Sequence, residues 1–183
     1  MVEVRSMADL VAGLGIIRES PADLGTIELI VRRPETNKRE VLDRAELDLD
    51  RGLVGDNWLV RGSRATQDGS AHPGMQLNLM NARVIELIAG PRENWPLAGD
   101  QFYVDLDLSA DNLPPGSRLS LGDAMIEVTD IPHLGCRKFI DRFGLDAAKF
   151  VNSEEGKLLN LRGINAKVIK PGCVNTGGII EKL

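Results

Sequence analysis

The strongest constraint on the fold is the alternation of apolar and polar side chains in "FYVDLDLS", residues 102–109. Successive side chains of an extended segment point to opposite faces, so one face of this segment would be wholly apolar. That face would carry Phe102, Val104, Leu106 and Leu108. The segment "AMIEVTDI", residues 124–131, alternates in the same way. Both patterns predict β-strands that bury one face against a core.

Several other short segments also have the composition of strands, and helices are interposed between them. Further strands are predicted at 25–34, 38–43, 75–81, 163–172 and 177–183. Helices are predicted at 6–14, 82–90 and between Cys136 and about Leu161. The fold class expected from this order is α+β, predominantly β, built on an antiparallel sheet or barrel. The sequence has neither the β-α-β alternation nor the phosphate-binding glycine fingerprint of a Rossmann-type nucleotide binder, so that class is not indicated.

Length and charge narrow the classes of protein further. A chain of 183 residues is expected to form one domain, 1–183. Its net charge of −5 argues against a general affinity for nucleic acid. The apolar stretch from Leu10 to Ile17 is too short to span a membrane, so no membrane partner is expected. With no export signal, the two cysteines are expected to be reduced and the protein cytoplasmic, although spacing alone leaves a Cys136–Cys173 disulfide open.

The stretch "IPHLGCRKFIDRF", residues 131–143, holds the chemistry-bearing residues of greatest interest. Pro132 is expected to end the preceding strand at Ile131, and "CRKFIDRF" has helical spacing, which places Cys136 in the first turn of a helix. Helix N-termini and neighbouring cations lower the pKa of a thiol. A thiolate held in this way can attack, carry sulfur or ligate a soft metal. The alternative is that Cys136 is only a small buried side chain that packs behind Phe139.

The remaining candidate residues admit both functional and structural interpretations. His133 can be a general base or a structural hydrogen-bonding group, and His72 is expected to be solvated in a polar loop. That loop, residues 61–74, has the length and composition of a lid or binding loop. Zinc is not indicated, because the sequence lacks the paired cysteine and histidine spacings of zinc sites. Asp48 and Asp50 are expected to lie on a solvated strand face.

An ordered set of motifs gives the sequence a family resemblance. The segments "GLVGDNW", "GDQFYVDLDL", "LPPGSRLSLGDAMIEVT", "HLGC" and "RGINAKVIKPGCV" together resemble the MOSC domain, the C-terminal module of molybdenum cofactor sulfurase. The resemblance covers about residues 25–182 and implies a MOSC-type β-barrel with a few short helices. It departs from the family pattern at Gly99-Asp100-Gln101, where relatives commonly have "GEN", and at Gly177-Gly178. Pyridoxal phosphate also occurs in descriptions of the family, but it belongs to a separate aminotransferase-like domain.

The resemblance assigns the family's cysteine to Cys136. It implies that this thiolate ligates the molybdenum of a molybdopterin cofactor or carries sulfur. Some members reduce N-hydroxylated compounds with an electron-donor protein, and a sulfur-donor protein is the other expected partner. The expected catalytic residues are Cys136 and His133, with Cys136 as the metal ligand. Basic residues expected to bind the anionic cofactor are Arg137, Lys138, Arg162, Arg61 and Arg64. Two alternatives remain: a persulfide carrier without molybdenum, and a non-catalytic pterin- or partner-binding module.

Overall fold

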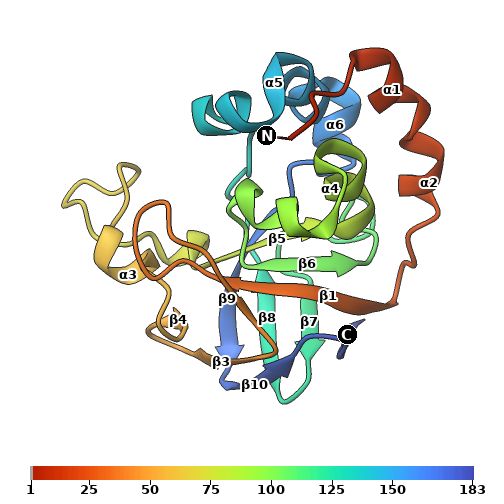
Figure 1. Ribbon diagram of the computed structural model, residues 1–183. Coiled ribbons are helices and arrows are strands. Elements are labelled where there is room, and N and C mark those ends of the chain that lie inside the picture. The colour runs from red at the N-terminus through yellow and green to blue at the C-terminus, as the bar shows by residue number, and fades with distance from the viewer. Residues whose placement is uncertain (1) are drawn as a thin grey trace.

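Seven strands close into a barrel in the computed structural model, which describes residues 2–183 (Figure 1). In chain order they are β1 (Leu24–Arg32), β5 (Leu77–Asn81), β6 (Phe102–Asp105), β7 (Arg118–Leu121), β8 (Ala124–Val128), β9 (Ile164–Lys170) and β11 (Ile179–Lys182). Their order around the barrel is β11-β7-β8-β9-β5-β6-β1, and pairing of β1 with β11 closes it. Neighbours are antiparallel except β5 and β6, which are parallel. The predicted α+β, predominantly β class is confirmed.

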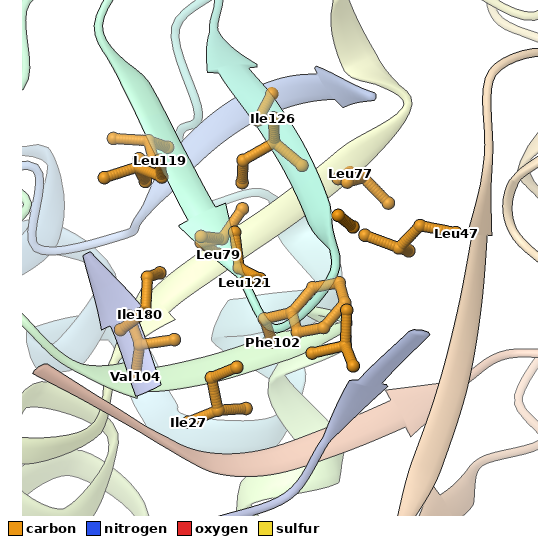
Figure 2. Packing of buried hydrophobic residues seen from close by; sticks show 14 of the residues in the cluster. Ile27, Leu47, Leu77, Leu79, Phe102, Val104, Leu119, Leu121, Ile126 and Ile180 are labelled. Carbon is orange, nitrogen blue, oxygen red and sulfur yellow. The ribbon is translucent and has the colours of Figure 1, made fainter. Parts of the chain in front are cut away.

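The barrel interior is filled by the apolar faces of these strands. Figure 2 shows the side chains of Ile27, Leu79, Phe102 and Val104 directed toward one another inside it. The alternation in residues 102–109 therefore correctly predicted the buried face, because the side chains of Phe102, Val104, Leu106 and Leu108 all belong to the barrel core. Tyr103, between them, is also fully buried, but it belongs to a second apolar cluster outside the barrel.

The second apolar cluster joins the barrel to helices at one end, which is uppermost in Figure 1. These helices are α1 (Met7–Ala12), α2 (Leu14–Arg18), α4 (Ala82–Ala89), α5 (Arg137–Asn152) and α6 (Glu154–Leu158). No helix within residues 2–183 is both long and apolar enough to cross a bilayer.

Shorter elements complete the fold. Strand β2 (Glu40–Leu42) pairs with β1, and β10 (Gly172–Asn175), β3 (Arg44–Asp48) and β4 (Gly52–Leu53) form a separate sheet. The polar segment that follows the short helix α3 (Trp58–Arg61) contains no strand up to the 3-10 helix η1 (Pro73–Met75), as expected of a loop. A second 3-10 helix, η2 (Arg92–Ala98), leads into β6.

Three of the predicted elements differ markedly from the structure, whereas most of the other strand ends shift by one or two residues. The single helix expected at 6–14 is two short helices, α1 and α2, although Ser6 caps the first of them as predicted. The strand expected at 102–109 ends at Asp105. The strand expected at 124–131 ends at Val128, because the chain beyond it is held by other contacts. The Thr129 hydroxyl donates to the Gly74 carbonyl, and the Asn165 amide donates to the Ile131 carbonyl. Residues 129–136 thus form an irregular connection that leads to Cys136.

Candidate functional site

Four arginines converge on the turn at the end of η2. Backbone carbonyls from Pro96 to Gly99 each accept a hydrogen bond from a different guanidinium. The pairs are Arg39 with Pro96, Arg142 with Leu97, Arg162 with Ala98 and Arg33 with Gly99. The last carbonyls of a helix often lack intrahelical partners. The Pro96 carbonyl also accepts the Gly99 amide, and the arginines supply partners to all four carbonyls. We refer to Arg33, Arg39, Arg142 and Arg162 as the arginine cluster.

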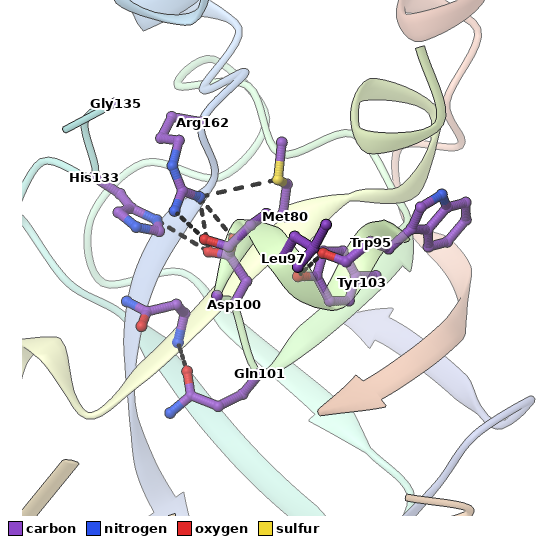
Figure 3. A network of polar contacts seen from close by, with 12 residues as sticks. Met80, Trp95, Leu97, Asp100, Gln101, Tyr103, His133, Gly135 and Arg162 are labelled. Atoms are coloured by element: carbon purple, nitrogen blue, oxygen red, sulfur yellow. Dashed lines mark hydrogen bonds and ion pairs between the residues drawn. The ribbon is translucent and has the colours of Figure 1, made fainter. Parts of the chain in front are cut away.

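Two members of the cluster are neutralised by buried carboxylates. The Asp100 carboxylate, which is fully buried, lies 2.7 and 2.9 Å from Nη1 of Arg162 (Figure 3). Arg33 makes a bidentate pair with Asp56, in which both N···O distances are 2.8 Å. Buried ion pairs of this kind need further hydrogen bonds, and the carbonyls of Ala98 and Gly99 supply them. These pairs fix the geometry of the turn.

The other two members have no counter-ion. Arg39 and Arg142 each donate to backbone carbonyls, but within residues 2–183 neither has a carboxylate at ion-pair distance. Partial burial lowers the pKa of Arg39, and the charges of Arg142 and Arg33 lower it further. Burial and then the charge of Arg33 also lower the pKa of Arg61, at the end of α3. Because arginines stay protonated at neutral pH, the site carries uncompensated positive charge that favours an anion.

Cys136 lies at the start of the helix that contributes to this cluster. It is the N-cap residue of α5, its thiol is free and exposed, and its side chain makes no capping hydrogen bond. The Cys136 carbonyl accepts a hydrogen bond from the Phe139 amide, with an N···O distance of 2.9 Å. The Phe139 ring lies beneath the Arg162 guanidinium, 5.0 Å from the ring centroid. Gly144, with φ of 88°, interrupts the helix after Phe143, so the dipole expected to act on Cys136 comes from a short segment.

The structure brings together only some of the predicted cofactor-binding residues. Arg162 is a member of the cluster, and Arg61 lies close enough to Arg33 for the charge of Arg33 to lower its pKa. Arg137 instead faces solvent, with 86% of its side chain exposed, and pairs with Asp141 one turn later at 3.0 Å. Lys138 and Arg64 are exposed, and no ion pair joins either of them to another residue in the described part of the chain. Adjacency to Cys136 in the sequence therefore does not place Arg137 or Lys138 in the arginine cluster.

His133, three residues before Cys136 in the sequence, lies next to the Asp100–Arg162 pair. Its Nδ1 is 3.5 Å from Oδ1 of Asp100, and 15% of its side chain is exposed (Figure 3). Burial, followed by the positive charge of Arg162, lowers the pKa of His133 to about 3, against the opposing effect of Asp100. The imidazole is therefore neutral at physiological pH, and what it offers a ligand is a hydrogen bond without a charge.

The low pKa of His133 predicts a pH dependence of stability. The unfolded chain binds a proton at this residue below about pH 6.5, whereas the folded chain does so only near pH 3. Stability should therefore fall as the pH is lowered from 6.5 toward 3, by about 1 kcal/mol for each pH unit attributable to His133. Urea unfolding across this range should show a shallower slope for His133→Gln than for wild type. Parallel slopes would contradict a buried, neutral His133.

Gly163 packs next to His133, and the space around it leaves no room for a side chain. Its φ is +108°, and a Cβ would lie 2.1 Å from the Leu79 carbonyl oxygen. Gly163→Ala should therefore lower the free energy of unfolding by about 2–3 kcal/mol. Gly116 is a matched control, because its φ is +91° but a Cβ there would meet nothing within 4 Å. Chemical unfolding of both variants should show a clearly smaller loss for Gly116→Ala; equal losses would show that crowding at Gly163 is unimportant.

The structure also places the two cysteines and the other side chains that could ligate a metal. The two cysteines are free, so the disulfide that the spacing left open does not form. Cys173 lies on β10, where its sulfur accepts a hydrogen bond from Arg44 at 3.1 Å. Among residues 2–183, no group of three or more histidine, cysteine, aspartate or glutamate side chains is placed to hold a metal. Any metal here must bring most of its own ligands.

Comparison with solved structures finds the same fold elsewhere. YuaD from Bacillus subtilis is 20% identical with a TM-score of 0.61, and the match covers 87% of this chain and 95% of YuaD. YiiM from Escherichia coli is 20% identical with a TM-score of 0.55, and the match covers 86% of this chain and 69% of YiiM. At this identity the likeness shows the fold alone. No protein-family model matches the chain, and no curated protein matches it.

Proposed function

We propose that the arginine cluster and Cys136 form the binding site of a molybdopterin-type cofactor, with the Cys136 thiolate as the protein ligand to molybdenum. The observation that carries this proposal is the uncompensated charge of Arg39 and Arg142 in the arginine cluster, whose member Arg33 also lies near Arg61. Guanidinium groups bind phosphate through paired N–H donors, and each of these arginines retains donors beyond the carbonyl contacts described above. The closed barrel and the ordered MOSC-like motifs are consistent with this assignment.

The donor set of the chain fits such a cofactor. Cys136 offers one accessible soft ligand, and the described residues offer no closed metal site. A molybdenum centre that already carries dithiolene sulfurs needs only one further thiolate from the protein. Asp100 and Asp56 would act indirectly, by holding Arg162 and Arg33 in place.

When bound, the cofactor would supply redox chemistry at molybdenum. The resemblance to MOSC proteins suggests N-hydroxylated compounds as substrates and an electron-donor protein as partner. In this role the residues of the chain would bind and orient the cofactor: the arginines would hold the anionic group, and the neutral His133, three residues before Cys136 in the sequence, would offer a hydrogen bond.

The exposure of Cys136 supports a second candidate function, which is sulfur transfer. An exposed thiol without a capping hydrogen bond is accessible to a sulfur-donor enzyme. Incubation with a cysteine desulfurase and cysteine should then add one sulfur atom to Cys136, as detected by mass spectrometry of its peptide. Addition to Cys173 instead would contradict the assignment of the reactive cysteine.

Neutralising the uncompensated arginines tests the anion site directly. The double variant Arg39→Gln, Arg142→Gln, produced in a host that makes the cofactor, should retain about a tenth or less of the wild-type pterin and molybdenum content, because charge-assisted hydrogen bonds are lost. Arg118→Gln is the matched control, since Arg118 is exposed and pairs with Glu127 away from the cluster. Equal cofactor contents in wild type and the double variant, with unchanged circular dichroism, would refute the anion site.

A further inference from the structure

A separate cavity of 470 Å³ lies beside the connection that leads to Cys136. Its walls come from the end of β8, the connection itself, α6 and the start of β9. Much of the lining is apolar, including Leu113, Pro115, Val128, Ile131, Leu134 and Val151. A volume of this size falls within the range of about 300–1,000 Å³ that is usual for small-molecule sites.

His133 supplies the polar group at the inner wall of this cavity. Its Nδ1 edge is turned toward Asp100, as Figure 3 shows, and Nδ1 has no hydrogen-bond partner within residues 2–183. Because the ring also lines the cavity, the opposite edge, which carries Nε2, is the one left to face it. The nearby carboxylate favours a proton on Nδ1, which leaves the Nε2 lone pair free to accept a hydrogen bond.

Two other polar side chains of the wall already have hydrogen-bond partners. The Asn165 side chain accepts from Asn78 and donates to the Ile131 carbonyl, and the Thr129 hydroxyl donates to Gly74. Asp130 and Lys157, both exposed, also line the cavity and carry opposite charges. An ion entering between them would be attracted by one and repelled by the other, so their charges favour an uncharged ligand.

We propose that this cavity binds a small, uncharged, mostly apolar molecule that presents an N–H or O–H group to Nε2 of His133. The site shares His133 with the cofactor site proposed above, but it needs neither Cys136 nor the arginine cluster. Occupancy of the two sites can therefore be measured separately.

Indole and 1-methylindole are matched probes, because they differ in the N–H group. Titration followed by NMR should show indole binding about 3- to 10-fold more tightly than 1-methylindole, the value of one net hydrogen bond. The Nε2 resonance of His133 should move with indole, whereas His72, the other histidine, serves as an internal control. In His133→Phe the two probes should bind equally.

Blocking the cavity provides a test that leaves His133 intact. Ala110 lines the cavity and is exposed, so Ala110→Trp can fill the space from its rim. This variant should lose binding of both probes, whereas Ala8→Trp, at an exposed position on α1, should retain it. The proposal is overturned if neither probe binds wild type at millimolar concentration, if both bind equally, or if binding survives in Ala110→Trp.

Discussion

Replacing Cys136 by serine is expected to leave a folded protein that retains less than about a tenth of the wild-type molybdenum. The thiol is exposed and caps nothing, so its loss should not alter the fold. A serine hydroxyl is a hard ligand that stays protonated at neutral pH, whereas molybdenum in a dithiolene environment favours a thiolate. Elemental analysis of protein from a cofactor-competent host measures the effect, and thermal unfolding should show an unchanged midpoint.

Cys173→Ser is the matched control for this experiment. Cys173 lies on β10 in the separate three-stranded sheet, where its sulfur contacts Arg44. This variant should bind as much molybdenum as wild type. Loss of metal from Cys173→Ser, with retention in Cys136→Ser, would show that the reactive thiol has been assigned to the wrong cysteine.

The second large effect is expected at Asp100, where Asp100→Ala should lower the free energy of unfolding by about 3–5 kcal/mol. The carboxylate is fully buried and makes two contacts with the Arg162 guanidinium, which is itself 7% exposed. Removing the carboxylate leaves a buried cation without a counter-ion, and water cannot replace it at low cost. Urea unfolding monitored by circular dichroism gives the difference.

Two controls separate the lost ion pair from other consequences of the substitution. Asp141→Ala breaks the solvent-exposed pair with Arg137 and should leave the unfolding midpoint nearly unchanged. The double variant Asp100→Leu, Arg162→Met removes both charges and should be more stable than Asp100→Ala. If Asp100→Ala costs less than about 1 kcal/mol, the pair does not hold the turn in place.

The barrel could be predicted from the sequence because its strands have one face on an apolar core. Phe102 and Val104 alternate with residues on the other face, and this period is visible without any structure. The ends of the strands were harder to predict, because they depend on tertiary contacts. The Asn165 side chain, for example, holds the Ile131 carbonyl, and nothing in the local sequence indicates this.

The candidate site could be predicted only in part. Cys136, His133, Arg162 and Arg61 are candidates that the sequence predicts, whereas Arg33, Arg39 and Arg142 are not predicted by any sequence pattern. These arginines come from the end of β1, the turn before β2 and the middle of α5, so no spacing in the sequence links them. The one local signal was Gly99-Asp100-Gln101, the segment that departs from the family pattern and that lies where the cluster converges.

The positions of Arg137 and Arg142 on α5 show that adjacency to Cys136 in the sequence does not predict contact with the arginine cluster. Arg137 follows the cysteine directly but points to solvent, toward Asp141. Arg142 is further along the chain, yet its guanidinium donates to the Leu97 carbonyl at the end of η2. A basic residue next to Cys136 in the sequence is therefore a weaker indication of a site residue than a basic residue whose side chain packs against the turn at the end of η2.

The most direct test of the proposed function is the cofactor content of the wild-type protein itself. The protein should be produced in a host that makes molybdopterin, purified without added cofactor, and assayed in parallel for molybdenum and for the fluorescent oxidation product of the pterin. A cofactor site formed by Cys136 and the arginine cluster predicts equimolar molybdenum and pterin, each at a level approaching that of the chain. Wild-type protein that carries neither, while a known molybdopterin protein from the same host is loaded, would contradict the proposal.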